Sequence, residues 1–351
     1  MSQALSAAGV DPSRHGGGER AGQGGREEDD SDEVVFSCRL DNAKSITTIL
    51  SCLSHGTRKD QQAQCENHHQ QQHQQQQHRH HHHHQQQQQR DCQQVTKDSM
   101  TLVVSGKAKY TQAQGCLDHS LFQEYDCVEG AKFGINLTTL LECLQIFGPG
   151  SLSQTSVSMA YQEARAMFRL TLEEGGVFTS CEIRTIHQDE DAMEFSALAK
   201  AFGNTDEVCR CILKSEILKE AFQELADLNG ATTVSVTFGQ EAPHLQLSAK
   251  GSIGSSEIDF PKTSEAFVCF DCHAPRVSWT YLMSGMETGM RALPHANETY
   301  FRVNEEGILC IQHQVPMSMG QTSFVDVLLC PDMQDMDMDM DREDEQEGRQ
   351  E

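Results

Sequence analysis

The chain has 351 residues, 37% of them hydrophobic, and a formal net charge of −25. This length leaves room for two ordinary domains, while the low hydrophobic share indicates that part of the chain is unfolded. Residues 34–331 contain 34 acids against 22 bases, a net charge of −12. Because phosphate neutralisation dominates nucleic-acid affinity, this charge excludes a free-standing duplex-DNA binder of the usual basic kind.

The two ends of the chain are strongly acidic. Residues 1–33 contain eight acids and three bases, and residues 332–351 contain ten acids and two bases. Both are predicted to be disordered, as an acidic arm and an acidic tail. The fourteen cysteines are scattered without a signal-peptide pattern, which favours a reducing, intracellular setting. No apolar stretch approaches membrane-spanning length, so no membrane partner is expected.

The first folded unit is predicted over residues 34–185. It opens with a strand at Val34–Leu40, and Asp41 or Asn42 is predicted to cap a helix over about 43–54. Lys44 falls on the polar side of that helix.

A glutamine- and histidine-rich tract then fills residues 55–90. Such a tract binds divalent metals in some proteins, but it offers no fixed ligand geometry, so no metal site is predicted. It is interpreted as an inserted solvated loop within one domain. Alternating patterns after it predict strands at 92–96, 100–105, 110–117, 121–128 and 131–137.

A short amphipathic helix is predicted at 137–147. Its apolar residues recur at helical spacing, Asn136 is the predicted cap, and Gly148-Pro149-Gly150 is the stop. A helix of about three turns is not stable alone, so its apolar stripe must lie on a sheet. Two further strands, joined by a turn at Glu174-Gly175-Gly176, end near Arg184.

Residues 186–206 lack clear periodicity and are interpreted as a connector to a second unit at 207–331. In that unit Ser215 is the predicted cap of a helix over 215–228, and a fourth helix is predicted at 281–293, although its glycines disfavour a helix. The predicted strands are 208–213, 232–238, 244–249, 256–260, 266–272, 299–303, 308–314 and 323–329.

The two units follow a similar order, which suggests an internal repeat. Phe168-Arg169 leads through a Glu-Glu-Gly turn into another strand, and Phe301-Arg302 does the same. In register with two helices per half, this echo favours a duplicated domain.

Several stretches resemble the DNA sliding-clamp family, and most closely its Rad-one family, which supplies one subunit of the heterotrimeric DNA-damage checkpoint clamp. They are SCRLDNAKSITTILSCL at 37–53, LFQEYDCVEGAKFGINLTTLLECLQIFG at 121–148, FRLTLEEGGVFTSCEI at 168–183, KSEILKEAFQEL at 214–225 and GSIGSSEIDFPK at 251–262. The resemblance covers most of residues 34–330. The chain departs from the family in the His/Gln insertion and the long acidic ends.

The resemblance implies an α+β sliding-clamp fold, with two similar domains that each have an outer antiparallel sheet and two inner helices. Three different subunits would close into a ring around double-stranded DNA, and the helices near 43–54, 137–147, 215–228 and 281–293 would line the hole. An ATP-dependent clamp loader would open the ring at damage sites in the nucleus, and checkpoint and repair proteins would bind its outer face. Neither a cofactor nor a metal is implied.

The resemblance also suggests where the functional residues lie. The DNA-facing candidates are Lys44, Lys107, Lys109, Lys214, Lys219, Arg276 and Arg291, and the candidates for a partner groove beside the connector are Met193, Phe195, Leu198 and Phe202. Glu220, Glu224 and Asp227 share the polar face of the third helix and would repel phosphate, so partner subunits are expected to supply most of the positive lining. The expected subunit edges are 110–117 and 177–184 or its second-domain counterpart.

Three alternatives stay open. A 3′→5′ exonuclease would need carboxylates that converge on two metal ions, and the available groups are Glu173-Glu174, Asp189-Glu190-Asp191 and Glu305-Glu306. A homotrimeric replication-type clamp and an acidic scaffold without a DNA role are the other two. Cys269-Phe-Asp-Cys272-His273 matches the covalent haem signature, but it lies in a predicted strand. A phosphate-binding Gly-x-x-x-x-Gly-Lys loop is absent, so ATP hydrolysis is assigned to another protein.

Overall fold

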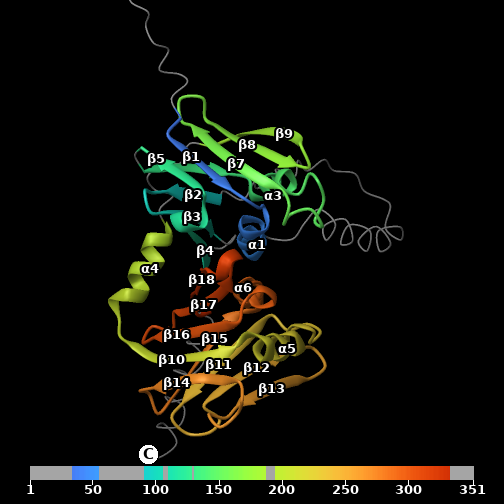
Figure 1. Cartoon of the computed structure of the whole chain (residues 1–351). Coiled ribbons are helices and arrows are strands. Elements are labelled where there is room, and N and C mark those ends of the chain that lie inside the picture. The colour runs from blue at the N-terminus through green and yellow to red at the C-terminus, as the bar shows by residue number, and fades with distance from the viewer. Residues whose placement is uncertain (1–33, 55–90, 106–109, 129, 187–193, 333–351) are drawn as a thin grey trace, which may run out of the picture.

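The computed structural model describes residues 34–54, 91–105, 110–128, 130–186 and 194–332 (Figure 1). The predicted arm, the His/Gln insertion and nearly all of the tail lie outside these ranges. Elements of the first half are β1 (Phe36–Leu40), α1 (Lys44–Leu53), β2 (Asp91–Val95), β3 (Ser99–Ser105), β4 (Thr111–Asp118), η2 (His119–Leu121), β5 (Glu124–Cys127), β6 (Ala131–Ile135), α3 (Leu137–Leu144), β7 (Ser156–Gln162), β8 (Met167–Glu174) and β9 (Val177–Arg184).

The helix α4 (Glu194–Asn204) then leads into the second half. Its elements are β10 (Glu207–Lys214), α5 (Ser215–Ala226), β11 (Thr233–Gly239), β12 (Leu245–Lys250), β13 (Ser255–Phe260), β14 (Phe267–Cys272), β15 (Arg276–Leu282), α6 (Met283–Met290), η4 (Leu293–His295), β16 (Glu298–Asn304), β17 (Leu309–Pro316), η5 (Ser318–Gly320) and β18 (Thr322–Leu329). Antiparallel strands with few helices confirm the predicted α+β class.

The strands form three antiparallel sheets. One has the order β5-β1-β7-β8-β9, and another has the order β13-β12-β11-β15. Between them, a nine-stranded sheet runs β14-β10-β16-β17-β18-β4-β3-β2-β6 and crosses from one half to the other where β18 pairs with β4. Val327 lies opposite Ala113 at this crossing. The halves therefore share one continuous sheet.

One large hydrophobic core extends through both halves, and a second, smaller cluster lies under α4. In the first half Phe133 of the central sheet stacks on Tyr161, with ring centroids 4.0 Å apart, and lies 5.5 Å from the Phe168 ring. Both partners belong to the five-stranded sheet, so these aromatic contacts join two sheet layers.

The predicted cap of α3 is confirmed, because the Asn136 side chain accepts a hydrogen bond from the Thr139 backbone N–H at 2.9 Å. The predicted caps of α1 and α5 are wrong. Ala43 occupies the cap position of α1, and Lys214 occupies that of α5, both without a side-chain bond to the helix. Ser215 is fully buried instead, and its hydroxyl is 2.8 Å from that of Thr299.

Two elements correct the sequence interpretation of the second half. The helix predicted at 281–293 begins too early. Residues 276–282 form strand β15, so 281 and 282 are the last residues of that strand, and the helix α6 begins at Met283. The connector also contains the helix α4, because Leu198 and Phe202 lie one turn apart and bury against the central sheet.

Each half has nine strands and two α-helices in the same order among the described residues, with α4 between them. The sequence echo is nevertheless out of register with this repeat. Phe168 lies in β8, the eighth strand of its half, whereas Phe301 lies in β16, the seventh strand of the other half. The repeat is thus supported by element order and not by the matching residues.

Candidate DNA-facing and partner-binding surfaces

The helices α1, α3, α5 and α6 lie on one side of the molecule, in the order α3, α1, α6, α5 (Figure 1). Close packing of the helices on the central sheet sets how near this layer lies to the sheet. A Cβ added to Gly115 of β4 would lie 2.5 Å from Ile49 of α1, and one added to Gly289 of α6 would lie 2.8 Å from Ile311. The glycines that disfavoured the fourth helix are therefore the residues that let it approach the sheet.

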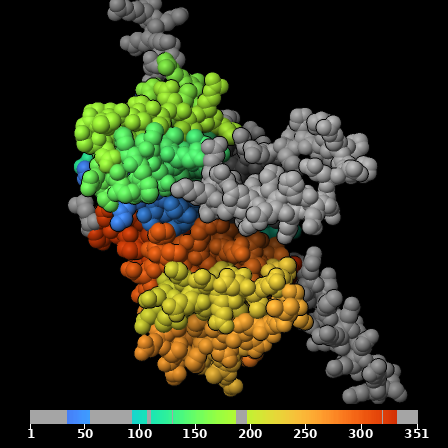
Figure 2. Space-filling model, turned by 90° about the vertical axis from the view of Figure 1, so that its right-hand side faces the viewer, coloured from blue at the N-terminus to red at the C-terminus, as the bar shows by residue number. Residues whose placement is uncertain are grey.

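This helical face is acidic. Figure 2 looks onto it, with α1 in blue, α6 in orange and α5 in yellow. The charged residues within these helices are two lysines and five glutamates, all exposed, which gives a net charge of −3. They are Lys44, Lys219, Glu142, Glu216, Glu220, Glu224 and Glu287.

Three of the predicted DNA-facing lysines are exposed at this face. Lys44 begins α1, Lys214 directly precedes α5, and Lys219 lies within α5. Glu216 and Glu220 are next to Lys219 on the same helix, so the local field there is mixed. Lys107 and Lys109 lie outside the described residues.

Arg291 and Arg276, the two predicted DNA-facing arginines, do not lie with these lysines on the exposed surface of the helices. The Arg291 Nη1 donates to the carbonyl oxygen of Ser54 at 2.6 Å, so this side chain at the end of α6 binds the end of α1. Burial lowers the pKa of its guanidinium, although Glu287 opposes the shift. Arg276 begins β15 opposite Gly239, about 20 Å along the strand from α6. The structure therefore does not bring all the candidate bases together.

The connector helix covers the opposite, outer face of the central sheet. Leu198 and Phe202 are each 9% exposed and pack on Ile308, Cys310 and Leu328. The guanidinium of Arg302 lies 5.4 Å from the centre of the Phe202 ring.

Asn304 holds the end of α4, and the sequence interpretation missed it. Its side chain is fully buried and bonds to the Phe202 carbonyl oxygen at 3.5 Å and to the Thr205 hydroxyl. Met193 lies outside the described residues, as does the side chain of Phe195. The last residue of a strand gives no local signal that its side chain reaches the connector.

The sheet edges correct one prediction about subunit contacts. Strand β4, expected to be an edge, pairs with β3 on one side and β18 on the other, so it is central. Strand β9 pairs with β8 alone, and β13 pairs with β12 alone, in the described part of the chain. Val177 and Phe178 of β9 are 58% and 68% exposed, and Ile253 beside β13 is 87% exposed.

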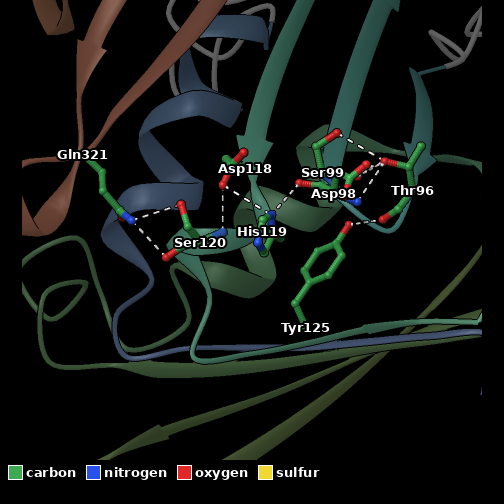
Figure 3. A network of polar contacts seen from close by, with 8 residues as sticks. All are labelled: Thr96, Asp98, Ser99, Asp118, His119, Ser120, Tyr125 and Gln321. Atoms are coloured by element: carbon green, nitrogen blue, oxygen red, sulfur yellow. Dashed lines mark hydrogen bonds and ion pairs between the residues drawn. The ribbon is translucent and has the colours of Figure 1, made fainter.

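A polar network at the C-terminal end of β4 joins the two halves (Figure 3). The Gln321 side-chain amide donates to the Ser120 carbonyl oxygen at 2.9 Å. The Asp118 carboxylate accepts from the Ser120 N–H at 2.9 Å, and hydrogen bonds from the Ser120 side chain and from this N–H lower the pKa of Asp118. Tyr125 donates to the Thr96 carbonyl oxygen at 2.7 Å. This arrangement braces the joint.

The acidic groups considered for an exonuclease lie apart. Glu173-Glu174 end β8 and Glu305-Glu306 follow β16, at different hairpins, and Asp189-Glu190-Asp191 lie outside the described residues. Within the described ranges, no group of three or more His, Cys, Asp or Glu side chains is arranged to hold a metal ion. In the same ranges, every helix is too short or too polar to cross a membrane.

Comparison with known proteins identifies the family. Residues 84–315 match the model of the repair protein family Rad1/Rec1/Rad17. The human cell cycle checkpoint protein RAD1 is 31% identical over 310 residues, which cover 87% of this chain and 94% of that protein. The mouse protein of the same name is 36% identical over 242 residues, or 68% of this chain and 82% of the relative.

A more distant relative agrees. The DNA damage checkpoint control protein rad1 of Schizosaccharomyces pombe is 25% identical over 261 residues, which cover 68% of this chain and 78% of that protein. The chain belongs to the Rad1/Rec1/Rad17 family of repair proteins.

Proposed function

We propose that this chain is a non-catalytic subunit of a heterotrimeric clamp that encircles duplex DNA in the nucleus, acts in the DNA-damage checkpoint and serves as a platform for repair proteins. The main support is the layer of four helices on one side of two repeated halves that share a continuous sheet. Such a layer is suited to line a hole. The relatives' names refer to the cell-cycle and DNA-damage checkpoints.

Residues 34–185 and 207–331 are the two domains in this proposal, and 186–206 connect them. The domains bend around the DNA, with the helices inward and the sheets outward. An ATP-dependent loader opens the ring, so the chain itself holds DNA by enclosure rather than by affinity.

The charge of the helical face favours a heterotrimer over a ring of three identical chains. Each copy has a net charge of −3 on its four helices, so a homotrimer would surround the phosphates with about three times that negative charge. Two different subunits with basic helices remove this repulsion. Lys44, Lys214 and Lys219 then add local contacts to the phosphate backbone.

Strands β9 and β13 are the proposed ring contacts. Each is an edge strand among the described residues, and each has a large exposed apolar residue on or beside it, Phe178 and Ile253. An unprotected edge of this kind pairs readily with another chain. Antiparallel addition of a partner strand would cover Phe178.

Checkpoint and repair proteins are proposed to bind on the outer face, beside α4. Met193 and Phe195 are the proposed contact residues there, while Leu198 and Phe202 anchor the helix to the sheet. The exonuclease alternative is not favoured, because the family names indicate a checkpoint protein.

The substitution Phe178→Asp tests the ring contact. It places a charge in the proposed interface, so the complex with the two other clamp subunits should weaken at least tenfold by analytical ultracentrifugation. Val268→Asp is the matched control, because Val268 is 52% exposed on β14, an edge that the proposal leaves free. Equal assembly of both variants would refute β9 as the contact.

A further inference from the structure

Four cysteines lie on two neighbouring strands at the edge of the central sheet. Cys209 and Cys211 belong to β10, and Cys269 and Cys272 belong to β14, which pairs with β10 alone in the described chain. All four are free thiols. The proposed clamp function uses none of them.

The register places one pair directly opposite each other. Cys209 faces Cys272, and the His273 N–H donates to the Val208 carbonyl oxygen at 2.9 Å. That bond flanks the pair, so Cys209 and Cys272 form a non-hydrogen-bonded pair, in which Cα atoms are about 4.5 Å apart. This separation falls within the range of about 4.4 to 6.8 Å found for disulfides.

The same register excludes a disulfide between Cys209 or Cys272 and either of the neighbouring cysteines, Cys211 and Cys269. Cys211 faces Phe270, and Cys269 faces Ile212. Cys269 is three residues from Cys272 on an extended strand, so the two side chains point to opposite faces and cannot meet. The haem signature at Cys269–His273 is therefore a chance match, because its two cysteines point to opposite faces of the strand and cannot hold the same haem.

We propose that Cys209 and Cys272 are a modification site, at which hydroperoxides produce a reversible cross-strand disulfide. Cys272 is the entry point because it is only partly buried, whereas Cys209 is 1% exposed. The Cys272 thiol donates weakly to the Ala274 carbonyl oxygen at 3.4 Å, at the open end of the strand.

The reaction has two steps. The Cys272 sulfur attacks the terminal oxygen of a hydroperoxide, which yields a sulfenic acid and releases an alcohol, or water from hydrogen peroxide. The Cys209 sulfur then attacks the sulfenic sulfur and displaces its oxygen as water. Two thiols lose two electrons and two protons in total, and the peroxide gains them. Two molecules of a small-molecule thiol reverse the bond: the first forms a mixed disulfide with one cysteine, and the second displaces that cysteine and leaves the small-molecule disulfide.

Burial sets the speed of this chemistry. It raises the pKa of the Cys209 thiol, and the nearby Cys211 and Cys272 add to the shift. The second step is therefore slow at neutral pH, so the pair stays reduced in a reducing compartment and responds to sustained oxidant.

The disulfide would fix β14 to the strand that follows the connector. Glu207, which begins β10, comes three residues after the end of α4, and β14 has no partner on its outer side among the strands that the structure describes. Closing a loop between residues 209 and 272 restricts the unfolded chain, so oxidation should raise the melting midpoint by about 5 °C.

Peptide mapping of the full chain tests this site. The protein is treated with hydrogen peroxide, quenched in acid, alkylated and digested, and the cross-linked peptide is sought by mass spectrometry. The expected product joins Cys209 to Cys272, weighs two hydrogens less than the separate peptides, and disappears after treatment with dithiothreitol. Cys272→Ser should abolish it, while the control Cys269→Ser should leave it unchanged.

Two results would overturn the proposal. One is a Cys209 that is still a free thiol, alkylated once the quenched protein is denatured, after Cys272 has been oxidised beyond the thiol. The other is a Cys209 that links to a different cysteine in the unsubstituted chain. Melting curves of both serine variants, recorded under reducing conditions, establish whether each variant folds. If Cys272→Ser does not fold, Cys209→Ser provides a second test, because it should also abolish the cross-linked peptide.

Discussion

At the scale of single residues, a buried histidine joins three elements of the second half. His313 of β17 is fully buried, its Nε2 lies 2.6 Å from the Gly289 carbonyl oxygen of α6, and its Nδ1 lies 2.9 Å from the Thr299 hydroxyl. The contact with a carbonyl oxygen requires an N–H on Nε2, so Nδ1 accepts from Thr299 in the neutral ring. Ser215 extends this chain of bonds to the start of α5.

Acid should destabilise the protein through His313. Burial lowers its pKa in the folded state from 6.5 to about 4, although the bond to Gly289 opposes the shift. The unfolded chain takes up the proton first, so this contribution to stability is complete above about pH 6.5 and falls as pH drops toward 4. The loss is about 3 kcal/mol at most.

Urea unfolding at several pH values between 7.5 and 4.5 measures this effect. The other histidines titrate as well, so the informative quantity is the difference between the natural chain and His313→Gln. The glutamine variant should be less stable at pH 7.5 and lose less stability on acidification. Parallel curves for the two chains would contradict the assignment.

At the scale of elements, the helical layer depends on glycines in the sheet and in α6, where the two surfaces meet. Gly115 of β4 leaves room for Ile49 and Leu53 of α1, and a Cβ there would lie 3.2 Å from the Leu53 side chain and nearer still to Ile49. Gly285 of α6 has a similar role, because a Cβ added there would lie 2.8 Å from the Thr111 hydroxyl. The short distance between the helices and the sheet thus depends on glycines, which have no side chain at these contacts.

Gly115→Val should push α1 away from the sheet and lower the free energy of unfolding by about 3 kcal/mol, because Ile49 presents a branched carbon that cannot rotate away easily. Thermal melting monitored by circular dichroism measures the loss. Gly150→Val is the control, since no atom lies within 4 Å of the Cβ that would be added there. A similar melting midpoint for both variants would show that the layer adapts.

The elements also show how far local patterns reach. Alternation predicted most strands, and leucine spacing with Asn136 predicted α3, because these signals lie within a few residues. Strand β15 was missed because its apolar end runs directly into α6. The pairing of β4 with β18 was missed because the partners are about 210 residues apart, and so a central strand was expected to be an edge.

The same limit applies to the candidate surfaces. The acidity of the third helix is visible in the sequence, and so are Lys44 and Lys219 as exposed bases. Arg291 looks the same in the sequence, but its contact with Ser54 comes from the other half of the chain. No local pattern distinguishes a base that faces solvent from one that joins two helices.

At the scale of the whole molecule, the halves act as one body because they share a sheet, a core and the brace at Gln321. One such unit, with its helices on one side and β9 and β13 as its proposed contact edges, does not enclose DNA by itself. The net negative charge of its helices fits the proposed ring, in which two different subunits supply the basic helices. These features together favour one place in a mixed ring.

The mass in solution, by light scattering after size exclusion, tests this account most directly. The full chain is measured alone and after mixing with the two other subunits of a checkpoint clamp. We expect a monomer alone and a one-to-one-to-one complex in the mixture. A stable trimer of the chain by itself, or a monomer that ignores both subunits, would contradict the account.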